Sequence, residues 1–136
     1  MALIPVFVPD GSATTQAFTT STSEIDPAGA YEVKANNTGA AVATLPTPVA
    51  KHTKLKDSND QIIDPSVVYG QYIKLSIATL GTSWTVTYYD ASEGASYEAT
   101  FNNVADELVL VAVPVSGDQL GGYMVVENNS VSLAAA

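Results

Sequence analysis

The stretch from Gln71 to Asp90 constrains the fold more than any other part of this chain, because apolar and polar residues alternate along it in two successive runs. The apolar members are Ile73, Leu75 and Ile77 in the first run and Trp84, Val86 and Tyr88 in the second. A period of two is the pattern of half-buried β-strands. Gly81 lies between the runs and can take the positive φ of a tight turn, so the stretch predicts a β-hairpin.

Similar short runs, separated by turn sequences roughly every 8–12 residues, continue through the chain, and no amphipathic helix is evident. Turns are predicted at Asp26–Gly29 and Asn36–Gly39, and a second hairpin turn at Asn128–Asn129. The run Leu108–Val113 is apolar at every position, which predicts a strand covered on both sides. We therefore expect an all-β fold, an antiparallel β-sandwich or a barrel-like, jelly-roll-like single domain spanning residues 13–136.

The N-terminal residues 1–12 differ from the rest because they are apolar but interrupted by Pro5 and Pro9. Proline donates no ladder hydrogen bond, so this segment is predicted to be an extended arm or an edge strand. It has no positively charged beginning, which argues against a signal peptide. The core is expected to be anchored by the lone tryptophan and by apolar members of the strand runs. These core anchors are Trp84, Val86, Ile73, Leu75 and Leu110.

Composition excludes several classes of function. Five lysines and no arginine stand against fourteen acids, so the net charge is −9. Nucleic-acid binding requires a basic surface, which this chain lacks, and anionic membranes are disfavoured for the same reason. No apolar run approaches the roughly 20 residues needed to cross a bilayer. The chain has no cysteine, so neither disulfides nor thiolate metal sites can form.

No residue pattern predicts catalysis, a metal site or a cofactor. His52 is the single histidine, and no nucleophile motif lies near it in the sequence. The acids Asp106 and Glu107, like Asp57 and Asp60, have the spacing of ordinary turn residues. Seven tyrosines could line a sugar-binding platform, but their spread over the chain favours packing within strands. We therefore expect no enzymatic activity and no cofactor.

Four short segments, taken in order, carry a resemblance to a known family. They are Ala43-Thr44-Leu45-Pro46, then Leu55-Lys56-Asp57-Ser58-Asn59-Asp60, and then Tyr72-Ile73-Lys74-Leu75 leading to Leu80-Gly81-Thr82-Ser83-Trp84-Thr85-Val86. This order resembles a β-module common in structural proteins of tailed bacteriophages, namely head fibres, tail fibres and capsid decoration proteins. The resemblance covers residues 30–90, and prolines at positions 48 and 65 replace glycines that are frequent in the module.

The resemblance implies a non-enzymatic virion protein, often a homotrimer. The chain length favours a capsid decoration (cement) protein on the outer capsid surface, with the major capsid protein as its partner. The arm then supplies the candidate capsid-binding residues, Leu3, Ile4, Val6, Phe7 and Val8, because an extended segment can add to the edge of a neighbouring sheet. The alternatives are a head or tail fibre subunit, a carbohydrate-binding β-sandwich module and a small enzyme.

Overall fold

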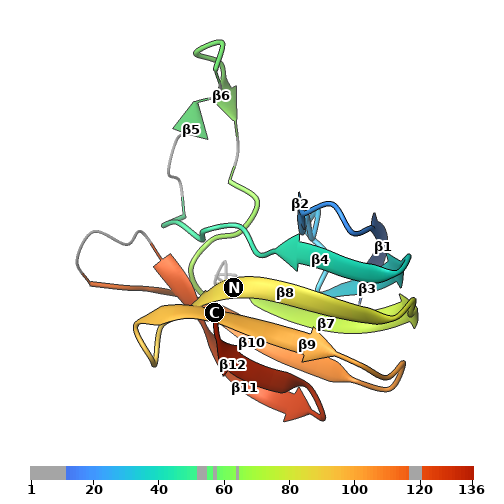
Figure 1. Cartoon of the computed structure of the whole chain (residues 1–136). Helices are drawn as coiled ribbons and strands as arrows, with labels where there is room; N and C mark the ends of the chain where they lie inside the picture. The colour runs from blue at the N-terminus through green and yellow to red at the C-terminus, as the bar shows by residue number, and fades with distance from the viewer. Residues whose placement is uncertain (1–11, 52–54, 57, 64, 117–120) are drawn as a thin grey trace, which may run out of the picture.

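The computed structural model of the chain describes residues 12–51, 55–56, 58–63, 65–116 and 121–136. Within these ranges every regular element is a β-strand, which confirms the all-β prediction (Figure 1). The strands are β1 (Ala13–Phe18), β2 (Ser23–Glu24), β3 (Glu32–Asn37), β4 (Ala40–Thr44), β5 (Leu55–Lys56), β6 (Ile62–Ile63), β7 (Tyr72–Thr79), β8 (Ser83–Asp90), β9 (Ala95–Phe101), β10 (Glu107–Pro114), β11 (Gly121–Asn129) and β12 (Ser132–Ala135).

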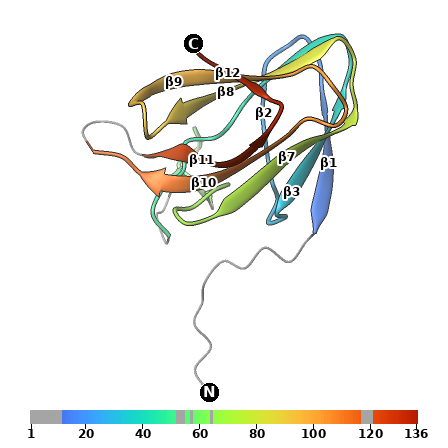
Figure 2. The same ribbon diagram turned by 90° about the horizontal axis from the view of Figure 1, so that it is seen from below.

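Ten of these strands form one continuous sheet that curls into a nearly closed, barrel-like sandwich (Figure 2). One layer has the strand order β1-β3-β7-β10-β11, and the other has the order β2-β4-β8-β9-β12. The layers are joined where Tyr123 of β11 pairs with Asp90 of β8. Figure 2 shows the two layers facing each other across the core, so each strand has one side turned inward and one turned outward.

The first part of the chain is a stack of three β-arches, by which we mean strand–turn–strand units whose two strands lie in opposite layers. The arches are β1–β2, β3–β4 and β7–β8. Strand β3 pairs in parallel with both β1 and β7, and β4 pairs in parallel with both β2 and β8. The period-two pattern fits this arrangement, because each arch directs one row of alternating side chains into the space between its two strands.

Two glycines allow the second and third arches to stack closely at their turns. A Cβ added to Gly81 would lie 2.4 Å from the backbone nitrogen of Gly39 and 2.6 Å from its carbonyl oxygen. The same turns are joined by a 2.8 Å hydrogen bond from the Thr82 amide to the Gly39 carbonyl. Gly39 itself has a φ of +65°, in the left-handed region that favours glycine. Turn stacking therefore requires a missing side chain at position 81.

The remaining ladders are antiparallel and include hairpins, apart from the single parallel pair Tyr123–Asp90 that joins β11 to β8. Strand β9 pairs with β8 on one side and with β12 on the other, while β10 pairs with β7 and β11. The β8–β9 hairpin turns at Gly94, whose φ is +68°. The antiparallel pairing expected from the sequence therefore holds in this part of the molecule, whereas the arch stack contains the parallel ladders.

The structure corrects two predicted hairpins. The strands predicted on either side of Gly81 form as β7 and β8, but they pair with other strands and not with each other. Gly81 is also absent from the residues with positive φ, so its role is close approach and not turn geometry. Likewise β11 and β12 do not pair with each other, since β12 pairs with β9. Asn128 and Asn129, predicted to form the turn, are the last two residues of β11, and the chain turns at Ser130 and Val131. Both predicted hairpins are arches.

The core fills the space between the layers and centres on Trp84. All five predicted core anchors have no exposed surface: Trp84, Val86, Ile73, Leu75 and Leu110. The Trp84 ring contacts Phe18 from the arch stack, with centroids 5.1 Å apart, and Phe101 from β9, at 4.8 Å. Trp84 therefore ties the parallel and antiparallel parts together.

The short hairpin β5–β6 stands apart from the sandwich, as Figure 1 shows. Its turn is closed by an ion pair of 3.3 Å between Lys56 and Asp60, and both side chains are mostly exposed. Asp60 has a φ of +62°, which a short polar side chain tolerates. We call this element the finger.

Candidate functional site

The buried acid Asp90 holds a turn together. Its carboxylate accepts hydrogen bonds from the amides of Ser92 and Glu93, at 2.9 and 3.0 Å, and from the hydroxyl of Tyr88 at 3.3 Å. Burial and the nearby Asp90 charge raise the pKa of Tyr88. These three hydrogen bonds hold the β8–β9 connection in place.

Asp106 has the same structural role between β9 and β10. Its carboxylate accepts hydrogen bonds from the amides of Asn102 and Asn103, at 2.9 and 3.1 Å. Among the described residues no group of three or more His, Cys, Asp or Glu side chains could hold a metal ion. His52 lies outside the described residues, so the sequence interpretation of this histidine stays a prediction.

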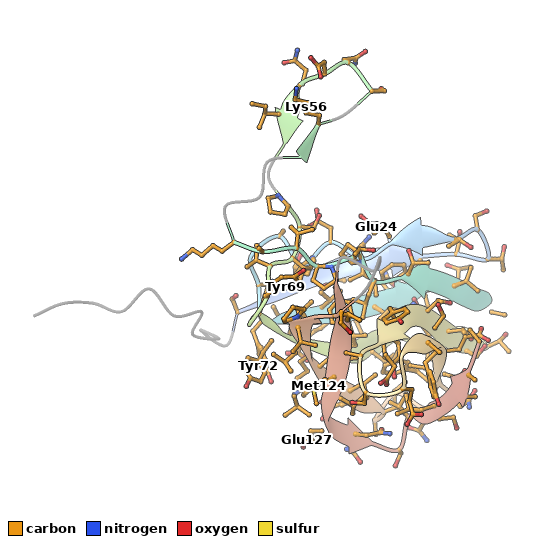
Figure 3. All side chains as sticks on the ribbon, turned by 90° about the vertical axis from the view of Figure 1, so that its left-hand side faces the viewer. Glu24, Lys56, Tyr69, Tyr72, Met124 and Glu127 are labelled. Carbon is orange, nitrogen blue, oxygen red and sulfur yellow. The ribbon has the colours of Figure 1, made fainter. Side chains whose placement is uncertain are left out.

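The outer face of the first layer carries a row of apolar side chains across three neighbouring strands. Tyr72 of β7 and Met124 of β11 both pair with Val111, which lies between them on β10. Tyr72 is 38% exposed, Met124 43%, and Val126, two residues further along β11, 53%. We call Tyr72, Val111, Met124 and Val126 the outer-face patch. Figure 3 shows Tyr72 and Met124 close together on one side of the sandwich, well away from Lys56 on the finger.

An ion network borders the outer-face patch. Lys74 lies two residues after Tyr72 on β7, and its ammonium group is 3.2 Å from Glu107 and 4.0 Å from Glu32. The hydroxyl of Ser76 donates a 2.6 Å hydrogen bond to Glu32. The hydrogen bond to Glu107 raises the pKa of Lys74, and burial opposes this effect. The network neutralises part of the acidic surface beside the patch.

The outer-face patch corrects the prediction made for the apolar run of β10. The run Leu108–Val113 was expected to be covered on both sides. Its inward residues are fully buried and Val109 on the outer side is buried as well, but Val111 and Val113 on the outer side are only half-buried by the described residues. The unbroken apolar run predicts a cover along the whole outer side. The described part of this chain provides that cover at Val109 and only in part at Val111 and Val113.

The aromatic residues form no broad sugar-binding platform. Trp84 is fully buried, and Tyr88 and Tyr123 are 2% and 1% exposed. Tyr72 is the only aromatic residue among the exposed large apolar side chains of the described ranges. The five capsid-binding candidates, Leu3, Ile4, Val6, Phe7 and Val8, lie outside the described residues.

Comparison with known proteins identifies no relative. The chain matches no protein-family model, no curated protein and no solved structure. In the described ranges no helix is long and apolar enough to span a membrane.

Proposed function

We propose that the protein is a non-enzymatic structural subunit that attaches to a larger protein assembly. In its specific form this is a capsid decoration protein, bound to the major capsid protein on the outer surface of a tailed-bacteriophage virion. The outer-face patch is the observation that carries the proposal, because it gathers exposed apolar side chains on a chain with a net charge of −9. Contiguous exposed apolar surface is typical of sites that bind other proteins.

The chemistry of the buried acids supports a structural function over an enzymatic one. Asp90 and Asp106 each accept two backbone hydrogen bonds within a turn, so their carboxylates are engaged in holding the connections between strands. The virion form of the proposal comes from the sequence resemblance, which also implies a homotrimer.

The proposal is tested by mixing the protein with undecorated capsid particles and measuring occupancy. The double variant Tyr72→Ser/Met124→Ser should bind at least about tenfold more weakly, because burying each of these side chains contributes roughly 1.5–3 kcal/mol. Val104→Ser is the matched control, since Val104 is 62% exposed in the turn between β9 and β10 and lies outside the patch.

The patch, the capsid function, the arm and the homotrimer can each be excluded by a different result. Equal occupancy of the double variant and the Val104→Ser control would remove the patch from the interface. Failure of the unaltered chain to bind any particle would remove the capsid function. Deletion of residues 2–9 tests the candidates Leu3, Ile4, Val6, Phe7 and Val8, and undiminished occupancy would exclude the arm. A monomer by light scattering at micromolar concentration would exclude the homotrimer.

A carbohydrate-binding module is the second candidate, and the exposed ring of Tyr72 on a sheet face favours it. An aromatic ring in this position can stack against the apolar face of a sugar. Retardation in affinity gels containing polysaccharide, lost on Tyr72→Ala, would support this function. Unretarded migration together with binding to particles would favour the decoration protein.

A further inference from the structure

Strand β1 is an open edge of the first layer. Among the described residues it pairs with β3 alone, and Figure 2 shows it as the outermost strand beside β3. Open edges present main-chain donors and acceptors that can pair with another strand. The available groups belong to alternate residues of β1.

The hydrogen bonds to β3 determine which residues face the open side. The Glu32 amide donates to the Ser12 carbonyl at 3.1 Å, and the Thr38 amide donates to the Phe18 carbonyl at 3.0 Å. Backbone groups alternate in direction along a strand, so the even-numbered residues of β1 face β3. The odd-numbered residues Ala13, Thr15 and Ala17 therefore direct their N–H and C=O groups to the open side.

This edge has none of the usual features that prevent strand pairing. Its sequence, ATTQAF, contains no charge and no proline, and its pairing with β3 shows no bulge. Proteins commonly protect open edges with lysine, proline or bulges. The absence of charge also matters because the whole chain carries −9, so two copies repel each other over most of their surface.

We propose that β1 pairs antiparallel with β1 of a second copy, about a two-fold axis that passes between the two Thr15 residues. The outward-facing residues are spaced symmetrically about Thr15. The register is therefore self-complementary: Ala13 opposes Ala17 of the second copy, and Thr15 opposes Thr15. Each opposed pair exchanges two N–H···O bonds. The paired side chains are exposed Ala and Thr, which are small, and opposed threonines are a favourable cross-strand pair.

Acids at the rim predict how this contact responds to salt. The amide side chain of Gln16 donates to the carbonyl of Glu24 and accepts from the amide of Asp26, both at 2.9 Å. These interactions place Glu24 and Asp26 beside β1, so two-fold pairing brings like charges from both copies together. The main-chain contact is unaffected by salt, whereas the repulsion is screened. Dimerisation should therefore strengthen as salt is raised.

The first test is disulfide trapping, which is unambiguous because the chain has no cysteine of its own. In the proposed register the two Cα atoms at position 15 lie about 5.5 Å apart, within the range that a disulfide spans. The two Cα atoms at position 17 lie about 14 Å apart, given a rise of about 3.4 Å per residue. Under mild oxidation Thr15→Cys should yield mostly covalent dimer, and Ala17→Cys should stay at background. Equal yields from the two variants would overturn the proposal.

The second test uses light scattering at a concentration on the order of 100 µM, since a single-strand contact belongs to the small, transient class of interface. Thr15→Val should dimerise like the unaltered chain. Thr15→Glu should be shifted to the non-associated state, because two carboxylates would oppose each other at the axis. Within one copy the new carboxylate lies beside Lys34 on β3, so folding is supported. Equal association of the two variants would refute the contact.

This contact is independent of the proposed function. A two-fold contact through β1 adds to any three-fold assembly, so light scattering distinguishes a dimer, a trimer and a hexamer of paired trimers. Deleting residues 2–9 removes the candidate capsid arm and should leave trapping at position 15 unchanged. Loss of trapping in this variant would assign the contact to the arm and overturn the pairing of β1.

Discussion

The arch stack and the antiparallel part of this molecule are built from the same kind of sequence but pair their strands differently. β7 and β8 are both alternating eight-residue strands joined by a glycine-containing turn, and they lie in opposite layers. β8 and β9 are joined by another glycine-containing turn, and they pair directly. Alternation and turn residues thus predict strands and turns but leave open which strands become neighbours.

The difference between the two parts lies in what each turn must accommodate. The Gly81 turn lies against the backbone of Gly39, whereas the Gly94 turn has open space around it and needs only a positive φ. An arch turn is therefore constrained by its neighbour in the stack, and a hairpin turn by its own backbone. A substitution can therefore destabilise one part without the other, except at Trp84, which contacts both parts.

The largest effect is expected for Trp84→Ala, which removes the ring that contacts Phe18 on one side and Phe101 on the other. Deleting a fully buried large aromatic side chain costs about 3–5 kcal/mol of unfolding free energy. Urea denaturation followed by circular dichroism measures this loss. Trp84→Phe should recover part of it. A loss under about 1 kcal/mol would show that the two parts fold independently of this contact.

A smaller effect is expected when alanine replaces each turn glycine. Gly81→Ala should cost about 1–3 kcal/mol, because the new Cβ meets the backbone of Gly39 and one arch turn must move. Gly94→Ala should cost about 1 kcal/mol through its left-handed φ alone. The unfolding free energies of the two variants give the comparison. A Gly81→Ala variant as stable as the parent would contradict turn stacking.

Much of the fold could be predicted from the sequence, because burial of alternate side chains is a local signal. Period two predicts burial of Ile73, Leu75 and Val86, and the large apolar area of the lone tryptophan adds to that prediction for Trp84; all four are buried. Strand pairing could not be predicted in this way. One partner of β7 is β3, whose paired residues lie just over forty positions earlier, and that choice depends on contacts with no local signature.

The candidate site was less predictable than the core. Tyr72 and Met124 lie 52 positions apart in the sequence, and they come close because β10 lies between their strands. The unbroken apolar run Leu108–Val113 is the one local sequence signal of this surface, and by itself it predicts a strand covered on both sides. Whether such a strand is covered by its own chain or by a partner depends on tertiary structure.

Alkaline pH should weaken the junction between the two parts. The hydroxyl of Tyr123 on β11 donates a 2.5 Å hydrogen bond to the carbonyl of Pro46, which follows β4, and burial raises the pKa of Tyr123. Above about pH 10 the unfolded chain loses this proton while the folded chain keeps it, so stability falls with rising pH. The expected slope is about 1.4 kcal/mol per pH unit.

Denaturation series between pH 9 and pH 11 provide the measurement, and Tyr123→Phe provides the control. This variant cannot ionise at position 123, so its stability should decline less steeply above pH 10, even though it starts lower through loss of the bond to Pro46. Equal slopes in the two proteins would contradict the assignment of the alkaline transition to Tyr123.

The smallest effect is expected for two amide side chains that each hold one connection. One lies in the first arch of the stack, and the other lies at the last turn of the antiparallel part. Gln16 joins β1 to the carbonyl of Glu24 and the amide of Asp26, and Asn128 bonds both backbone groups of Val131. Gln16→Ala and Asn128→Ala should each cost about 0.5–1.5 kcal/mol. Their local consequences should differ. β1 is an edge strand with one neighbour, so Gln16→Ala should accelerate amide exchange along β1 and leave β9 protected. Uniform acceleration over both layers would mean that Gln16 stabilises the whole sandwich and not its first arch.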